Sequence, residues 1–189
     1  MPSRSGDYYT LADALAWGEQ DHNELIYGVP FDLKIPLRIH QEVRRNLGIQ
    51  LYNYADGKLC EVYYVPLAVR LFERDGDRPE DVNTLVEPDI TVVCDSTKLD
   101  DIRCRGAPDL VVEILSPWTR RHDKFTKFNL YQKAGVREYW IVDPDGKYVQ
   151  VFVLTDGYYT AVDFGEAGDK LKVNVLEDCV VDLSRVFSE

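Results

Sequence analysis

The chain has 189 residues, of which 45% are hydrophobic, and a formal net charge of −11 at pH 7. This length and apolar content predict one domain with a sizeable core. The N-terminus is polar and the apolar runs are short, so we expect neither a signal peptide nor a membrane span, and a cytoplasmic protein. The acidic balance argues against a surface covered with phosphate-binding lysines, and it is the main observation against a nucleic-acid partner.

The four cysteines lie far apart and include no Cys-x-x-Cys pair. They are Cys60, Cys94, Cys104 and Cys179. We predict reduced, mostly buried thiols, and neither a disulfide framework nor a zinc site.

The first elements are short, up to one long helix. Thr10 is a candidate N-cap with an acid in the first turn after it, which predicts a helix over residues 10–20. Residues 24–30 have the pattern of a strand that ends in a turn. Apolar and aromatic side chains recur at steps of three and four over 38–54, which predicts an amphipathic helix that ends at Asp56-Gly57.

The rest of the chain is predicted to be mainly strand. We expect strands over 61–72, 86–95 and 109–115, the last two nearly continuously apolar, as central strands covered on both faces tend to be. A helix over 123–134 should end at Gly135, in the left-handed C-cap conformation. A further strand over 138–143 and an antiparallel meander follow.

This order of elements predicts an α/β (α+β) domain with a mixed central β-sheet flanked by helices, followed by C-terminal antiparallel strands. We assign residues 1–189 to a single domain. Residues 1–36 form an N-terminal helix and strand extension, 37–143 the core, and 144–189 the C-terminal β meander.

Two of the apolar strand segments contain carboxylates, Asp89 and Glu113, which are costly to bury unless they are paired or bound to a metal ion. Alternation along the strand places Asp109 on the same face as Glu113. These two are about 13 Å apart at about 3.3 Å per residue, so one ion cannot bind both. Glu113 therefore needs a partner from a neighbouring strand, and Asp89 is the best candidate.

The helix after the second of these strands supplies cations. Lys124, Lys127 and Tyr131 share one of its faces. Between residues 103 and 137 there are eight basic and three acidic residues, a local net charge of +5. Hydrolysis of a phosphodiester requires a metal to polarise the phosphate and activate water, and a cation to stabilise the developing charge. Two carboxylates, Mg²⁺ and a lysine meet these requirements.

These residues resemble a known signature. Pro88-Asp89 followed by Glu113-x-Leu115 is similar to the PD-(D/E)XK nuclease motif with its lysine replaced. The longer pattern is similar to a large bacterial family of restriction endonucleases of the Uma type. It consists of Glu87-Pro-Asp, Gly106-Ala-Pro-Asp-Leu-Val-Val-Glu-Ile-Leu-Ser-Pro, Asp123, Lys127-x-x-x-Tyr131 and Ala134-Gly-Val-x-Glu-Tyr-Trp-x-Val-Asp-Pro144. Weaker likeness extends to residues 25–30 and to His40, so the resemblance covers most of the chain.

The resemblance implies a restriction-endonuclease-like core and a metal-dependent endonuclease. Asp89 and Glu113 would bind Mg²⁺ (or Mn²⁺), and the substrate would be nucleic acid, DNA in the first place. Leu115 occupies the position of the motif lysine. Related nucleases tolerate this by recruiting a lysine from the next helix, which points here to Lys127. Because double-strand cutters often work as pairs, a homodimer is compatible with this interpretation.

Each candidate also has a structural interpretation. Asp109 follows Pro108 near a strand start. Capping of a turn and a supporting role at the site are equally good interpretations of this residue. Glu113 could form a buried ion pair with Lys127. Asp123 is most simply the N-cap of the lysine helix. His40, with Glu42 beside it, is a further candidate because the first helix of related nucleases contributes a polar group. The alternative function is a degenerate nuclease domain that binds nucleic acid or protein without cutting.

Overall fold

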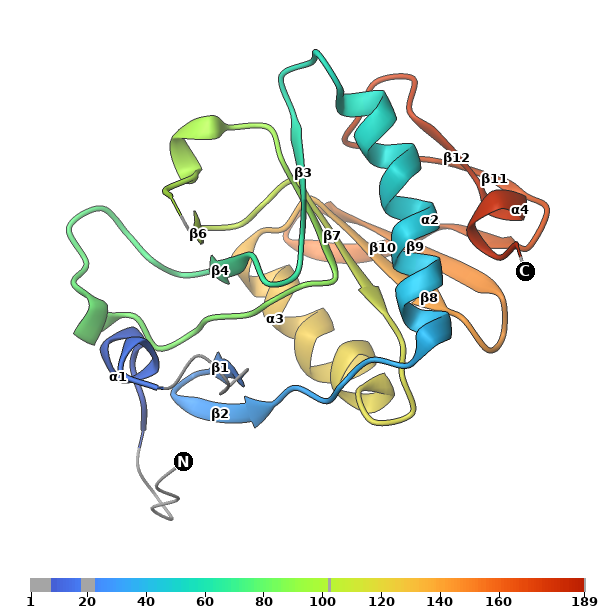
Figure 1. Ribbon diagram of the computed structural model, residues 1–189. Helices are drawn as coiled ribbons and strands as arrows, with labels where there is room; N and C mark the ends of the chain where they lie inside the picture. Colours follow the sequence, from blue (N-terminus) through green and yellow to red (C-terminus); the bar gives the residue numbers. More distant parts are fainter. Residues whose placement is uncertain (1–7, 18–22, 102, 189) are drawn as a thin grey trace.

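The computed structural model describes residues 8–17, 23–101 and 103–188. Its centre is a six-stranded mixed sheet with the strand order β10-β9-β8-β7-β5-β3 (Figure 1). Strands β7 and β8 are parallel, and the other neighbouring pairs of this sheet are antiparallel. The strands are β3 (Glu61–Tyr64), β5 (Ile90–Val93), β7 (Leu110–Ile114), β8 (Glu138–Asp143), β9 (Tyr148–Thr155) and β10 (Tyr158–Glu166). The predicted mixed α+β fold with a C-terminal meander is confirmed.

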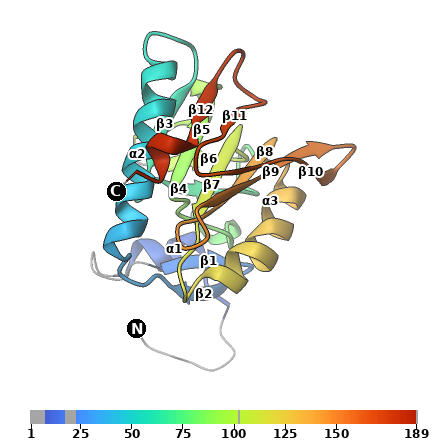
Figure 2. The ribbon, with the colours of Figure 1, turned by 90° about the vertical axis from the view of Figure 1, so that its right-hand side faces the viewer.

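Helices cover the two faces of this sheet. Helix α2 (Arg38–Ala55) lies on one face, and α3 (Phe128–Ala134) lies on the other (Figure 2). A π-helical turn, η3 (His122–Lys127), leads directly into α3. The alternating side chains of β7 divide between two cores, because Val112 packs in the cluster with α2 and Val111 in the cluster with α3. All five residues of β7 are buried, as expected for a central strand.

Small elements surround the central sheet. Strand β1 (Asn23–Ile26) pairs with β2 (Val29–Asp32), β4 (Ala68–Arg70) with β6 (Arg103–Arg105), and β11 (Lys170–Lys172) with β12 (Val180–Asp182). The short helices are α1 (Leu11–Leu15), η1 (Pro79–Asp81), η2 (Ser96–Lys98) and α4 (Leu183–Val186). No helix within the described ranges is long and apolar enough to cross a membrane.

Several predicted boundaries differ from the structure. The long strand expected over 61–72 is divided in two, because a turn with a cis peptide bond between Val65 and Pro66 separates β3 from β4. Helix α1 ends at Leu15, and the end of the predicted helix, residues 18–20, lies outside the described residues. The capping of α3 is confirmed, since Gly135 has a φ of 90°.

The prediction of reduced cysteines is wrong for one pair. Cys60 and Cys94 form a disulfide, whereas Cys104 and Cys179 are free and buried. The cause is the pairing of β3 with β5: Glu61 lies opposite Val93, so one further step along both strands brings Cys60 opposite Cys94. The sequence separation of 34 residues carried no sign of this contact.

Candidate functional site

The pairing of β5 with β7 brings the two predicted carboxylates together. Ile90 lies opposite Val112 in this antiparallel ladder, so Asp89, which directly precedes β5, is opposite Glu113. Residues directly opposite each other across an antiparallel pair have Cβ atoms about 5 Å apart. The register of β5 on β7 therefore places Asp89 and Glu113 close enough to act together.

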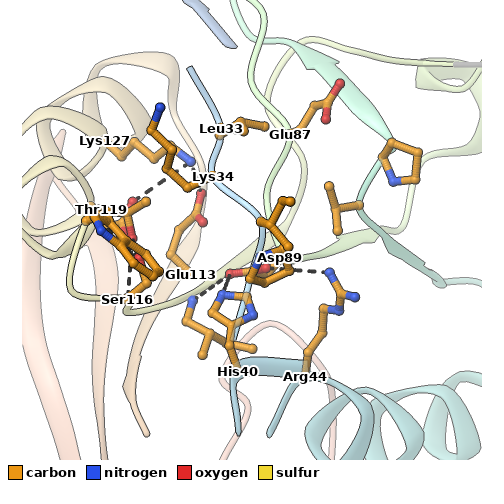
Figure 3. A pocket seen from close by; sticks show the side chains of 17 residues that line it. Leu33, Lys34, His40, Arg44, Glu87, Asp89, Glu113, Ser116, Thr119 and Lys127 are labelled. Atoms are coloured by element: carbon orange, nitrogen blue, oxygen red, sulfur yellow. Dashed lines mark hydrogen bonds and ion pairs between the residues drawn. The ribbon is translucent and has the colours of Figure 1, made fainter. Parts of the chain in front are cut away.

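Asp89 is held between β7 and α2. Its Oδ2 accepts a hydrogen bond from the backbone amide of Ile114 at 2.8 Å and lies 3.1 Å from Nε2 of His40. A guanidinium nitrogen of Arg44 lies 3.8 Å from Oδ1. His40 and Arg44 are one turn apart on α2, and Figure 3 shows both beside Asp89. The predicted His40 thus reaches the site through Asp89.

Glu113 is held by the other helical layer. Its Oε1 accepts hydrogen bonds from Nζ of Lys127 at 2.8 Å and from the hydroxyl of Tyr131 at 2.6 Å. Both donors lie on the segment formed by η3 and α3. The ammonium of Lys127 thus lies beside the acid of the motif although Leu115 occupies the motif position of the lysine. Leu115 itself is buried in the apolar core on that face of the sheet.

Lys127 also contacts a carboxylate that the sequence analysis did not select. Its Nζ lies 2.7 Å from Oε1 of Glu24, a residue of β1 whose side chain is fully buried. The same oxygen accepts the backbone amide of Glu87 at 2.9 Å, and Nε2 of His122 lies 3.7 Å from the other oxygen. A carboxylate inside an apolar strand was the signal that selected Asp89 and Glu113, and the same signal was present at Glu24.

The predicted role of Asp123 as a helix N-cap is wrong. Asp123 lies inside η3, is 2% exposed, and its Oδ1 is 3.9 Å from Nζ of Lys127. Burial raises the pKa of Asp123 to about 6, although Lys127 opposes this shift. The helical segment begins before Asp123, with Arg121 already in helical conformation, and this moves the acid from the helix end to its buried side.

Burial and charge act in opposite directions on these groups. Burial raises the pKa of Glu113 well above its usual value; Lys127 offsets this in part, while Asp123 and Asp89 add to the rise. Burial also acts to raise the pKa of Glu24, but the charge of Lys127 and hydrogen bonds outweigh it, so that pKa is lowered. Burial lowers the pKa of Lys127, yet the carboxylates raise it well above its usual value. Lys127 is therefore a buried ammonium stabilised by an excess of acid.

The structure does not bring Asp109 to this site. Asp109 directly precedes β7, where its Oδ2 accepts the backbone amide of Cys94 at 2.7 Å and its Oδ1 accepts Arg137 at 2.8 Å. Glu42 forms an ion pair with Arg38 on the surface of α2. These contacts are structural, and neither Asp109 nor Glu42 lines the pocket described next.

The carboxylates open into a pocket of about 360 Å³ (Figure 3). Its polar side includes His40, Asp89, Glu113, Asp123 and Lys127. Much of the remaining wall is apolar, formed by Leu33, Ile35, Pro36, Val65, Pro66, Ile114 and Trp118. A few converging polar groups in a largely apolar cavity are typical of a ligand site.

The donor set fits a hard divalent cation. Within the described residues, no group of three or more His, Cys, Asp or Glu side chains has the arrangement of a metal site. Mg²⁺, however, is usually bound through one or two carboxylates together with waters and substrate phosphates. Asp89 and Glu113 place two carboxylates at adjacent positions in the pocket. Burial is the main cause of the raised pKa of Glu113, and a cation bound at this point would offset the repulsion that Asp123 and Asp89 add to it.

The mixed α+β fold has a counterpart among solved structures. The chain aligns with the crystal structure of a putative nuclease belonging to DUF820 from Anabaena variabilis, with a TM-score of 0.73, 18% sequence identity, and coverage of 95% of this chain and 98% of the other. The family model Uma2, described as a putative restriction endonuclease, matches residues 7–184, and the chain belongs to this family. An uncharacterized protein of Synechocystis sp., slr1290, is 26% identical over 165 residues, which are 84% of this chain and 81% of that protein.

Proposed function

We propose that this protein is a Mg²⁺-dependent endonuclease that hydrolyses phosphodiester bonds in DNA. Asp89 and Glu113 bind the metal ion and Lys127 is the cation of the site. The observation that supports this most is the 2.8 Å contact between Nζ of Lys127 and Oε1 of Glu113. Lys127, which lies on a helical segment, takes the place of the motif lysine that the strand lacks at Leu115.

In this mechanism Lys127 and Tyr131 support Glu113 beside the bound metal ion. When bound, Mg²⁺ supplies polarisation of the phosphate and a lower pKa for an attacking water. Lys127 holds Glu113 in place and brings a positive charge to the wall of the pocket, where negative charge develops on the phosphate. Tyr131 fixes the same oxygen of Glu113 from the next turn. These contacts keep Glu113 in one orientation.

His40 and Arg44 act on the other ligand. Both lie against Asp89 and on the same face of α2, so they orient its carboxylate toward the pocket. His40 is a positioning residue in this scheme, since its Nε2 contacts the acid. Asp109 has no part in the reaction, because its two oxygens are used at the other end of β7.

The decisive experiment is cleavage of supercoiled and single-stranded DNA in the presence of Mn²⁺ or Mg²⁺. We expect the wild type to cut, and Asp89→Asn and Glu113→Gln to lose cleavage at least a hundredfold. Both substitutions preserve size, so circular dichroism should show a folded protein in each case. Asp109→Asn is the matched control, a carboxylate beside the same strand outside the pocket, and it should cut at the wild-type rate.

Metal binding is measured separately by thermal denaturation. A ligand bound only by the folded state raises the melting temperature, so millimolar Mg²⁺ should stabilise the wild type and not Asp89→Asn. Wild type that neither cuts nor responds to metal would refute the proposal and favour the noncatalytic binding module. Cleavage that persists in Glu113→Gln would refute the assignment of the ligands.

A further inference from the structure

We infer that the substrate of this pocket is an unpaired nucleic-acid strand, with one unstacked base held against Trp118 and the adjoining phosphates lying on the arginines of α2. This inference rests on the proposed function and names the substrate class of the same site. It is carried by two adjoining surfaces that the carboxylates and the lysine do not explain.

The first surface is the apolar wall of the pocket. Trp118 is 54% exposed and Ile35 is 89% exposed, although both line the pocket that contains the acids. A duplex presents phosphates and sugars to a protein and keeps the faces of its bases stacked inside. An unpaired strand offers a base face, which stacks well on an aromatic side chain. The exposed indole beside the carboxylates therefore matches an unstacked base and has no partner on the outside of a duplex.

The second surface is a shallow hollow on α2. It is lined by Arg38, Gln41, Glu42, Arg44, Arg45, Ile49 and Tyr64. Arg44 lines both this hollow and the pocket, so the two are continuous. Three arginines face one glutamate here, in a chain whose net charge is −11. The hollow is a local track for phosphates that begins beside the carboxylates.

The aromatic ring at the side of this hollow, that of Tyr64, packs against α2. A Cβ atom added at Gly48 in α2 would lie 2.3 Å from Cε1 of Tyr64, so the ring lies directly on the helix backbone. Tyr64 is 37% exposed and offers a second aromatic surface next to the arginines. Basic side chains with interspersed aromatic rings are the usual composition of a single-strand binding surface.

The short track also predicts the strength of the salt dependence. Arg38 and Arg45, the exposed arginines of the hollow, can contact about two phosphates, and each contact to a single strand contributes about −0.7 to the slope of log affinity against log salt concentration. We expect a slope of about −1.4. Such a modest slope agrees with the acidic character of the whole chain.

Binding is measured by fluorescence anisotropy in EDTA, so that no cleavage occurs. The probes are a labelled oligothymidine 12-mer and a blunt hairpin duplex of equal length. We expect tighter binding of the single strand. Trp118→Ala should weaken that binding by about tenfold, the effect of losing one stacked base. Trp118→Phe should retain most of the affinity, whereas a role in packing alone would not respond to the stacking ability of the ring.

Two controls test the location of the site. Phe125 is 65% exposed and Arg74 is exposed, and both lie outside the pocket and the hollow. Phe125→Ala and Arg74→Ala should leave single-strand affinity unchanged. Arg45→Ala should weaken binding of the single strand and reduce the salt slope by about 0.7.

Each outcome of the binding and cleavage experiments either supports or overturns the inference. Equal or tighter binding of the duplex, no binding of either probe, or full single-strand affinity in Trp118→Ala would overturn the inference. Metal-dependent cleavage of duplex plasmid combined with one of these results would leave the proposed function standing. Trp118-dependent binding of the single strand without cleavage under any condition would support the inference and refute the nuclease.

Discussion

Removing the ammonium of Lys127 should destabilise the fold strongly at neutral pH. Its Nζ lies 2.7 Å from Glu24, 2.8 Å from Glu113 and 3.9 Å from Asp123, and all four side chains are at most 5% exposed. Lys127→Met keeps the length of the side chain but leaves three buried acids without their counter-ion. Breaking a buried pair in this way costs about 3–5 kcal/mol. This is a large part of a total stability of about 5–15 kcal/mol.

The loss should shrink at lower pH. Glu113 has a raised pKa already in the presence of Lys127, and without the lysine this pKa rises further. A carboxyl group whose pKa is higher in the folded state than its usual value of 4.5 holds a proton that the unfolded state has released. Stability is therefore present at low pH and falls as the pH rises through this window. Between pH 7 and pH 5 the variant should regain about 1.4 kcal/mol per pH unit for each proton taken up.

Urea denaturation followed by tryptophan fluorescence measures this effect, since Trp140 is fully buried. The control is Lys124→Met, on the same helical segment, because Lys124 forms no ion pair with an acid among the described residues: its Nζ donates to the hydroxyl of Tyr148 at 3.0 Å and lies 5.6 Å from the centroid of that ring. It should cost less than about 1.5 kcal/mol, the net value of an ordinary hydrogen bond. A destabilisation by Lys127→Met no larger than that by Lys124→Met, or one of equal size at pH 5 and pH 7, would contradict this prediction.

Three further predictions concern groups outside the pocket. Burial acts to raise the pKa of Asp143, but its bonds with Arg120 and nearby backbone lower that pKa to about 2, so this carboxyl contributes stability that is lost as the pH falls from about 4 to 2. Asp143→Asn should lower the free energy of unfolding by up to about 2 kcal/mol at pH 7. The stability of this variant should also fall less steeply than that of the wild type as the pH drops from about 4 to 2, as measured by urea titrations at several pH values. Cys60→Ser should lower the stability of the oxidised protein by about 3–4 kcal/mol, because the bond to Cys94 closes a loop spanning 34 residues; equal urea midpoints for wild type and variant without reductant would contradict this. Asp109→Asn should lower the melting temperature without changing the cleavage rate per folded molecule, and a large drop in that rate would return Asp109 to the reaction.

Local patterns predicted the central part of the fold and the acids of the candidate site. The 3.6-residue period over α2, the apolar run of β7 and the left-handed glycine after α3 depend on neighbours close in sequence, so each was visible. The selection of Asp89 and Glu113 followed from the cost of placing charge in an apolar strand. Selection of Lys127 needed the resemblance to the nuclease motif in addition to its place on the helix face.

The missed features depend on contacts between distant segments. The disulfide of Cys60 with Cys94 requires the register of β3 on β5, which no local pattern contains. The contact of Glu24 with Lys127 requires β1 to lie beside the start of the lysine helix. Asp123 was assigned to the helix end because an acid is a good N-cap, whereas the π-helical turn begins earlier and turns Asp123 inward. In each case tertiary packing overrode a reasonable local preference.

The antiparallel pairing of β5 and β7 determines where the chain tolerates change. Asp89 precedes the first of these strands and Glu113 lies near the end of the second. The two acids therefore lie at one end of the β5–β7 ladder, and the connection between the strands lies at the other end. That connection, residues 94–109, holds η2 and β6 and lies the whole length of the ladder away from the acids. Insertions or deletions around residues 95–102 can therefore lengthen, shorten or replace this loop while the spacing of the acids stays set by the ladder. Changes in this loop should therefore leave the relative positions of Asp89 and Glu113 unaltered.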